Sequence, residues 1–228
     1  MYILSPENFA PLLLSLKLAL YTVVILLIIA SPVAWWLSQT ESRIKPVIEA
    51  ILALPIVLPP TVLGFYLLIA FSPDSTLGQW WQQLFGSSLS FSFESLIIAS
   101  VLYSFPFVLQ PIQVAFESLG RWPMETAAVL GLGRYESFRS IIIPLSRKGW
   151  VTGACLGFAH TIGEFGVVLM VGGNISGETR VVSIAIYDHV ETLNFTAVHE
   201  LSLVLLFISL VILIFVYAVN RNKITSFI

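Results

Sequence analysis

A histidine and a glutamate stand in an otherwise apolar stretch, GWVTGACLGFAHTIGEFG, which runs from Gly149 to Gly166. His160 and Glu164 are four residues apart, so on an α-helix their side chains share one face. A carboxylate in such a stretch serves as a functional group of a transport pathway, as a proton relay, or as a structural group bonded to a neighbouring helix. A metal site is a weaker interpretation, because two ligands without a third are a poor signal.

Three glycines at the start of the same stretch repeat every four residues. Gly149, Gly153 and Gly157 predict a smooth ridge on which another helix packs closely. At 3.6 residues per turn, His160 and Glu164 continue the face of this ridge. We therefore expect the Glu164 carboxylate to point at protein or a cavity and not at lipid.

The amino-acid composition indicates the class of protein in which these residues lie. Of the 228 residues, 57% are hydrophobic and 11% are charged, the mean hydropathy is +0.92 and the formal net charge is −2. These values are too apolar for a soluble domain of this size, so the sequence predicts an integral membrane protein in a lipid bilayer. The near-neutral charge argues against a nucleic-acid partner. The lone cysteine, Cys155, has no partner for an internal disulfide.

Five stretches are long and apolar enough to cross the hydrocarbon core, which takes about 20 helical residues. They are residues 9–37, 47–71, 96–116, 150–171 and 201–219. The first has no basic residue ahead of it and no clean cleavage site, so we interpret it as a retained span and not as a signal peptide. The predicted fold class is an all-α polytopic membrane protein of about five transmembrane helices, in one domain that covers residues 1–228.

Basic residues predict the orientation of the chain, because cytoplasmic loops are rich in lysine and arginine. Nine of the eleven fall in the first loop, the third loop or the C-terminal tail: Arg43, Lys45, Arg121, Arg134, Arg139, Arg147, Lys148, Arg221 and Lys223. The N-terminus is therefore expected outside and the C-terminus in the cytoplasm. Lys17 is an exception inside the first span, where its ammonium group reaches the interface or caps interior carbonyls.

Prolines interrupt two neighbouring spans. The second contains Pro55, Pro59 and Pro60 within LPIVLPPTVLG, and the third contains Pro106 and Pro111. Each proline removes a backbone donor and clashes with the preceding turn, so both helices are expected to kink or unwind. Freed carbonyls are tolerated in lipid only against protein or water. The pattern favours helices that line a pathway and move, with a purely structural kink as the alternative.

The third loop, residues 117–149, is polar but contains a short helical pattern, RWPMETAAVLGLGRYESF. Pro123 is placed to open a helix, Glu125 follows in its first turn, and Gly131 and Gly133 stop it. The apolar side chains of this helix would form a small surface that nothing else in the sequence obviously covers. These side chains are Met124, Ala127, Ala128 and Leu130. A solvated loop with an incidental helix is the alternative, and it leaves the surface unexplained.

The same segment carries a specific spacing. Glu125, Thr126 and Ala127 are followed by Gly131 and, after nine further residues, by the run Ile-Ile-Ile-Pro at residues 141–144. This resembles the cytoplasmic pattern of the inner-membrane permeases of binding-protein-dependent ABC importers: Glu-Ala-Ala, three residues, Gly, nine residues, then Ile-x-Leu-Pro. Thr126 and the isoleucine before the proline are mild departures. The resemblance extends over most of the chain.

Three further stretches resemble the molybdate and sulfate branch of this family. They are LPIVLPPTVLG, IGEFG at residues 162–166 and GGNISGETR at residues 172–180. The third is more similar to the molybdate members, in which proline commonly stands at the position of Ser176, and tungstate permeases have a similar stretch. The resemblance implies a molybdate permease, with sulfate or tungstate as the alternative substrate.

The resemblance also implies partners and a place in the cell. Two copies of the chain would form a homodimer around a central pathway in the bacterial cytoplasmic (inner) membrane. A cytoplasmic ABC ATPase, which handles ATP and magnesium, would grip the coupling helix, and a periplasmic binding protein would deliver the oxyanion. The permease itself would be no enzyme and would bind no cofactor. The sequence has no G-x-x-x-x-G-K-[ST] motif, in agreement with ATP being handled by a partner.

The residues expected to act form three groups, none of them catalytic or metal-binding. The ATPase-coupling group is Glu125, Ala127, Ala128, Gly131, Gly133, Ile141 and Pro144. The pathway and gate group is Pro55, Pro59, Pro60, Thr61, Glu164, Phe165 and Gly166. The outer-loop group is Asn174, Glu178 and Arg180. For Arg180 there are two interpretations: it meets the anion at the outer mouth, or it pairs with Glu178.

The fourth loop, residues 172–200, contains the apolar run VVSIAIY, which predicts a short helix lying on the outer face or dipping into the membrane. Two other function classes are alternatives. A proton-driven secondary transporter would use Glu164 as its relay, but it leaves the pattern at residues 125–144 without a purpose. An intramembrane hydrolase has little support, because Ser176 lies in an outer loop and no H-E-x-x-H motif exists.

Overall fold

The computed structural model describes residues 6–120 and 122–220, and its regular elements in these ranges are all helices. The first six are α1 (Pro6–Gln39), α2 (Lys45–Val57), α3 (Pro60–Phe71), α4 (Thr76–Phe85), α5 (Phe93–Leu119) and α6 (Trp122–Val129). They are followed by α7 (Arg134–Ser137), the π-helix η1 (Phe138–Ile142), α8 (Ile143–Leu145), α9 (Arg147–Gly163), α10 (Gly166–Gly172), α11 (Val182–Glu191) and α12 (Phe195–Asn220). Arg121, Arg221 and Lys223, which contribute to the predicted orientation, lie outside the described residues.

Three helices of the described chain are each long and apolar enough to cross a membrane: Asn8–Gln39 within α1, α5 and α12. Two further pairs, α2 with α3 and α9 with α10, pass the same test together but bend by 104° and 62° at their breaks. Counting each bent pair as one span gives five. The all-α membrane fold is therefore confirmed, and two of its spans are broken helices.

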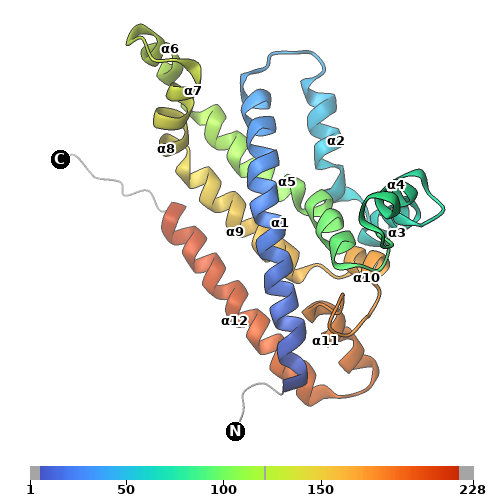
Figure 1. Cartoon of the computed structure of the whole chain (residues 1–228). Helices are drawn as coiled ribbons and strands as arrows, with labels where there is room; N and C mark the ends of the chain where they lie inside the picture. The colour runs from blue at the N-terminus through green and yellow to red at the C-terminus, as the bar shows by residue number, and fades with distance from the viewer. Residues whose placement is uncertain (1–5, 121, 221–228) are drawn as a thin grey trace.

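The centre of the bundle consists of α1, α5 and α9, which pack side by side (Figure 1). Leu26 and Ala30 of α1 meet Val108 and Ile112 of α5 in one fully buried cluster. By contrast, α12 lies at the edge, where it packs along α9 and α11 and meets α1 near its first turns, and only 6% of its most apolar stretch is buried. Its exposed surface is the kind that lipid covers.

The bundle has two distinct ends (Figure 1). The connection from α1 to α2 lies at the same end as α6, which we call the α6 end. The first residues of α1 and the whole of α11 lie at the opposite end, which we call the α11 end. The first and third predicted loops thus share one end, as an alternation of spans requires.

The prolines of the second span act as expected. Leu58 and Pro59 have extended backbone, and Pro60 stands at the first position of α3, where its missing donor costs nothing. In the third span the expected unwinding is wrong, because α5 runs unbroken through Pro106 and Pro111. Helix α9 packs directly against the turns of α5 that contain these prolines, and this contact supports α5 from one side.

The glycine ridge of α9 makes this close approach. Gly149, Gly153 and Gly157 are all buried against α5. A Cβ at Gly153 would come 2.9 Å from the Val108 carbonyl oxygen, and one at Gly157 would come 2.5 Å from the Val108 side chain. The predicted ridge is therefore confirmed, with α5 as its partner.

Gly149→Ala is expected to lower the thermal unfolding midpoint of the detergent-purified protein. A Cβ there would lie 2.6 Å from the Pro111 carbonyl oxygen, which is part of the rigid backbone of α5. Overpacking of this kind typically costs about 1–3 kcal/mol. The matched control is Gly163→Ala on the same helix, where a Cβ meets no atom within 4 Å. Equal midpoints for the two variants would contradict the ridge.

Candidate functional site

The two helix breaks meet around one cavity of about 580 Å³, which we call the hinge cavity. Five of the seven predicted pathway residues line it: Pro60, Thr61, Glu164, Phe165 and Gly166. The other two do not, because Pro55 lies within α2 and Pro59 caps the start of α3. Thr61 and Ala159 are 98 positions apart in the sequence, and both line the hinge cavity.

Glycines allow the two broken spans to lie back to back. A Cβ at Gly166 would come 2.8 Å from Pro60, and a Cβ at Gly64 would come 2.7 Å from the Met170 side chain. Each of α3 and α10 thus offers a glycine where the other helix approaches. The two breaks are held together by this packing, and the hinge cavity lies beside it.

Glu164 lies at the break itself and not on the glycine face of α9. The expectation that it continues that face is wrong, because α9 ends at Gly163 and Glu164 has extended backbone (φ −67°, ψ 133°). Its side chain is nevertheless buried, at 4% exposure, and lines the hinge cavity. Within the described chain neither carboxylate oxygen has a partner at full hydrogen-bond geometry, and the buried Ser100 hydroxyl is the polar group that lies near enough to interact with it. Burying such a group without a full hydrogen bond costs several kcal/mol, which marks the break as a functional position.

His160 is held by aromatic and hydroxyl groups of α5. Its ring stacks on Phe107 with centroids 3.9 Å apart and lies 4.8 Å from the Tyr103 ring. Its Nδ1 atom is 2.9 Å from the Ser104 hydroxyl oxygen. In residues 6–120 and 122–220 no three His, Cys, Asp or Glu side chains come together as a metal site would require. The histidine therefore forms one wall of the hinge cavity.

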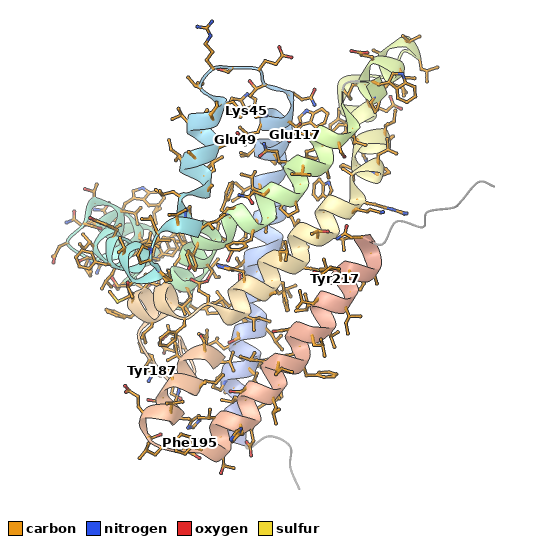
Figure 2. The ribbon with its side chains drawn as sticks, turned by 180° about the vertical axis from the view of Figure 1, so that it is seen from behind. Lys45, Glu49, Glu117, Tyr187, Phe195 and Tyr217 are labelled. Carbon is orange, nitrogen blue, oxygen red and sulfur yellow. The ribbon has the colours of Figure 1, made fainter. Side chains whose placement is uncertain are left out.

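The short helix predicted from VVSIAIY is present as α11, and it contacts the α9–α10 break. The Ser183 hydroxyl donates a hydrogen bond of 2.6 Å to the Glu164 carbonyl oxygen, which the break has freed. The Tyr187 ring lies 5.0 Å from the Phe165 ring, and Figure 2 shows Tyr187 on α11 at the α11 end. Sequence analysis missed this contact; its one signal was a serine inside an apolar run.

The outer-loop group does not form one site. Arg180 forms an ion pair with Asp188 of α11, and the Asn174 amide donates to the same carboxylate at 3.4 Å. The predicted pair of Arg180 with Glu178 is therefore wrong. The turn at residues 175–179 is closed by the Thr179 hydroxyl, which bonds to the Gly172 carbonyl at 2.6 Å, and it carries Glu178 away from the arginine.

A second polar cluster joins α2 to α5 at the α6 end (Figure 2). The Lys45 ammonium lies 3.0 Å from Glu117 and 3.7 Å from Glu49. The Gln113 amide donates to both carboxylates, at 2.6 Å to Glu49 and 3.0 Å to Glu117. A cavity of about 400 Å³ lies beside this cluster, between α2 and α5. The spacing of Lys45 and Glu49 was the signal that could have found it.

The coupling segment begins with α6, which starts next to Pro123 and ends before Gly131, as predicted. Gly131 has a φ of +78°, a left-handed conformation that favours glycine, and Leu132 bonds back to the Ala127 carbonyl at 3.0 Å. Glu125 lies exposed in the first turn. The helix thus has the boundaries that its sequence specifies.

The apolar surface of this segment differs from the predicted one. Ala127 is fully buried and Met124 packs on the core, so both face their own chain. The side chains that are exposed are large and lie on α6, the turn after it and α7: Trp122 at 73%, Val129 at 88%, Leu130 at 72% and Tyr135 at 77%. We call these four residues the coupling surface. Ala128 lies exposed beside them.

The coupling segment is joined stiffly to α9. Phe138 of η1 packs between the rings of Trp35 and Phe116, with centroids 5.1 and 6.1 Å away. Ile141 and Pro144 belong to η1 and α8, and only Ser146 separates α8 from α9. The Ser146 hydroxyl bonds back to the Ile142 carbonyl at 2.7 Å. A displacement of the coupling surface therefore reaches α9 and, at its far end, the Glu164 break.

Broken spans around a cavity, with an exposed helical segment at one end, define a membrane transport component. The family model described as "Binding-protein-dependent transport system inner membrane component" matches residues 19–224. The chain belongs to this family, and it is accordingly an inner-membrane component of a transport system.

Individual proteins of known identity are also similar to this chain. The molybdenum transport system permease protein ModB of Azotobacter vinelandii is 48% identical over 220 residues, which are 96% of this chain and 97% of that protein. ModB of Haemophilus influenzae is 35% identical over 179 residues, 78% of each chain. A solved inward-facing structure of the MetNI methionine ABC transporter has a TM-score of 0.72, covering 94% of this chain and 97% of that chain at 16% identity. This last likeness concerns the fold.

Ser183→Ala is expected to loosen the α9–α10 break. The substitution leaves the Glu164 carbonyl without its donor, and losing such a hydrogen bond costs about 1 kcal/mol or more. Amide hydrogen exchange in a peptide covering residues 162–168 should then rise roughly fivefold, because local opening becomes that much easier. Ser118→Ala is the control, since its exposed hydroxyl bonds only within α5. Unchanged exchange in Ser183→Ala would contradict the role of α11.

Proposed function

We propose that this chain is the transmembrane permease subunit of an ATP-driven ABC importer that moves molybdate across the cytoplasmic membrane by alternating access. The observation that carries the proposal is the 48% identity to a molybdenum transport permease over 96% of this chain. The match covers nearly the full length of both proteins, so it includes the hinge cavity and the coupling segment alike. Sulfate and tungstate are the alternative substrates.

The proposal includes a homodimer with its α6 end in the cytoplasm. Exposed apolar side chains on α2 and α3, among them Ile51, Leu54, Phe65 and Tyr66, lie beside the two cavities, and a second copy would cover them. Arg43, Lys45 and Arg147 lie at or next to the α6 end, as cytoplasmic segments require. The N-terminus is then outside and the C-terminus inside.

The hinge cavity is the proposed pathway for the oxyanion. Both α3 and α10 begin at it, at Pro60 and Gly166, so the positive ends of two helix dipoles face a passing anion. The Thr61 hydroxyl adds a neutral donor. Glu164, when ionised, repels a dianion from the same wall. The anion is thus attracted by partial charges and kept from binding tightly, as passage demands.

The coupling surface is the proposed contact for a cytoplasmic ABC ATPase, which would bind ATP and magnesium while this chain binds neither. Four large exposed side chains on α6, its following turn and α7 are what a partner groove covers. Closure of the ATPase would move α6, and the stiff connection through η1 and α8 would carry the motion to α9. A periplasmic binding protein would supply the oxyanion at the α11 end.

Val129→Asp is expected to abolish uptake while leaving membrane insertion intact. Val129 is 88% exposed, so its replacement disturbs no internal packing, but a carboxylate would be buried without a partner in the ATPase contact. Recovery of the ATPase with the tagged permease should fall more than tenfold. Ile44→Asp, at an apolar residue 60% exposed in the α1–α2 connection, should change nothing. Normal ATPase recovery with Val129→Asp would refute the coupling surface.

The substrate is tested by cellular molybdenum content at trace external molybdate. Cells lacking this chain should lose most of their molybdenum, wild-type chain should restore it, and Val129→Asp should not. Excess sulfate should barely compete. If molybdenum is unchanged while sulfate or tungstate uptake collapses, the molybdate assignment is wrong.

A further inference from the structure

A second large cavity lies on the outer side of α1, away from both breaks. It has a volume of about 590 Å³ and lies between α1, the α4–α5 connection and the turn before α11. Its polar lining consists of Lys17, Ser87, Ser88, Ser90, Ser92, Glu94 and Glu178. We call it the headgroup pocket. None of these residues belongs to the hinge cavity.

Lys17 supplies a cation without a carboxylate partner. Its ammonium lies 4.7 Å from the Phe93 ring and 5.9 Å from the Tyr21 ring, two cation–π contacts. In the part of the chain that the structure describes, Lys17 forms no ion pair, and neither do Glu94 and Glu178. Charges of both signs therefore face one pocket without neutralising one another.

The position of Lys17 along α1 places the pocket near a membrane surface. The 34 residues of α1 span roughly 50 Å, against a hydrocarbon core of about 30 Å. Lys17 comes eleven residues after Pro6, roughly 17 Å along the helix, so a centred α1 puts it just inside the core, within snorkelling reach of the headgroups. Tyr21 and Phe91, 47% and 48% exposed, are the aromatic residues expected at that depth.

An apolar stripe leads from the pocket toward the middle of α1. Leu20, Val24 and Ile28 are 60%, 48% and 69% exposed, and they follow Lys17 at helical spacing. Lipid acyl chains can pack against such a stripe, whereas a soluble anion would make no favourable contact with it. The pocket and the stripe together have the two-part chemistry of a phospholipid.

We propose that the headgroup pocket binds an outer-leaflet phospholipid with a phosphoethanolamine headgroup. Lys17 and the hydroxyls of Ser87 and Ser88, which form no hydrogen bond among the described residues, would bind the phosphate. Glu94 and Glu178 would accept hydrogen bonds from the primary ammonium. A choline headgroup has no N–H to donate, and a purely anionic headgroup would meet two carboxylates. The site therefore selects the zwitterion with a free ammonium.

The test is native mass spectrometry of the delipidated full-length protein with phosphatidylethanolamine, phosphatidylcholine or phosphatidylglycerol of identical acyl chains. Wild-type protein should retain the ethanolamine lipid best. Lys17→Met should lower that retention roughly tenfold, and Lys17→Arg should preserve it. The double variant Glu94→Gln with Glu178→Gln should bind ethanolamine and choline lipids equally. Arg43→Met, which removes one exposed cation at the α6 end, should have no effect.

Two results would overturn the proposal. One is equal retention of the three lipids by wild-type protein, or retention that Lys17→Met leaves unchanged. The other is displacement of the bound lipid by millimolar inorganic phosphate, which would make the pocket a site for free anions. If Lys17→Met fails to fold, the double glutamate variant still decides the question through its loss of selectivity. Molybdate uptake plays no part in these outcomes, so the proposed function stands or falls separately.

Discussion

The structure depends on one constraint: a backbone group freed inside a membrane must find a partner within the protein. The α9–α10 break frees the Glu164 carbonyl, and the Ser183 hydroxyl of α11 satisfies it. The α2–α3 break lies against the first one, with Gly166 close to Pro60. Two broken spans thus shield each other, and neither break would be tolerable alone in lipid. The hinge cavity exists because both breaks are present.

This arrangement makes α9 the central mechanical element. One end of α9 follows the coupling segment after a single residue, Ser146, and the other end is the Glu164 break. Its glycine ridge lies against α5, where the glycines contact both backbone carbonyls and the side chain of Val108. This close packing makes α9 and α5 move together as one body. The partly buried Phe138 and the Ser146 hydroxyl stiffen this end of α9, as the proposed transmission of movement requires.

Local structure was predictable from the sequence wherever a residue type has one characteristic structural role. Pro60 opens α3, Gly131 ends α6 in a left-handed conformation, and the glycine spacing finds its partner helix. Contacts between residues that are distant in the sequence were not predictable. Nothing in the sequence distinguishes Glu178 from Asp188 as the partner of Arg180, because the choice follows from the direction in which α11 returns. Likewise, nothing in the sequence distinguishes Pro106 and Pro111, which lie inside the unbroken α5 packed between α1 and α9, from Pro59 and Pro60 at the α2–α3 break.

The proposed anion pathway contains a carboxylate, and the geometry of the hinge cavity is compatible with it. Two helix amino ends offer partial positive charge that is fixed in the backbone and cannot be titrated away. A lysine or arginine in their place would hold a dianion by a full charge, and release would become slow. Glu164 works in the opposite direction, since an ionised carboxylate on the same wall repels a dianion. In the proposed pathway, weak attraction opposed by weak repulsion is the condition under which a small rotation of α9 can decide on which side the anion leaves.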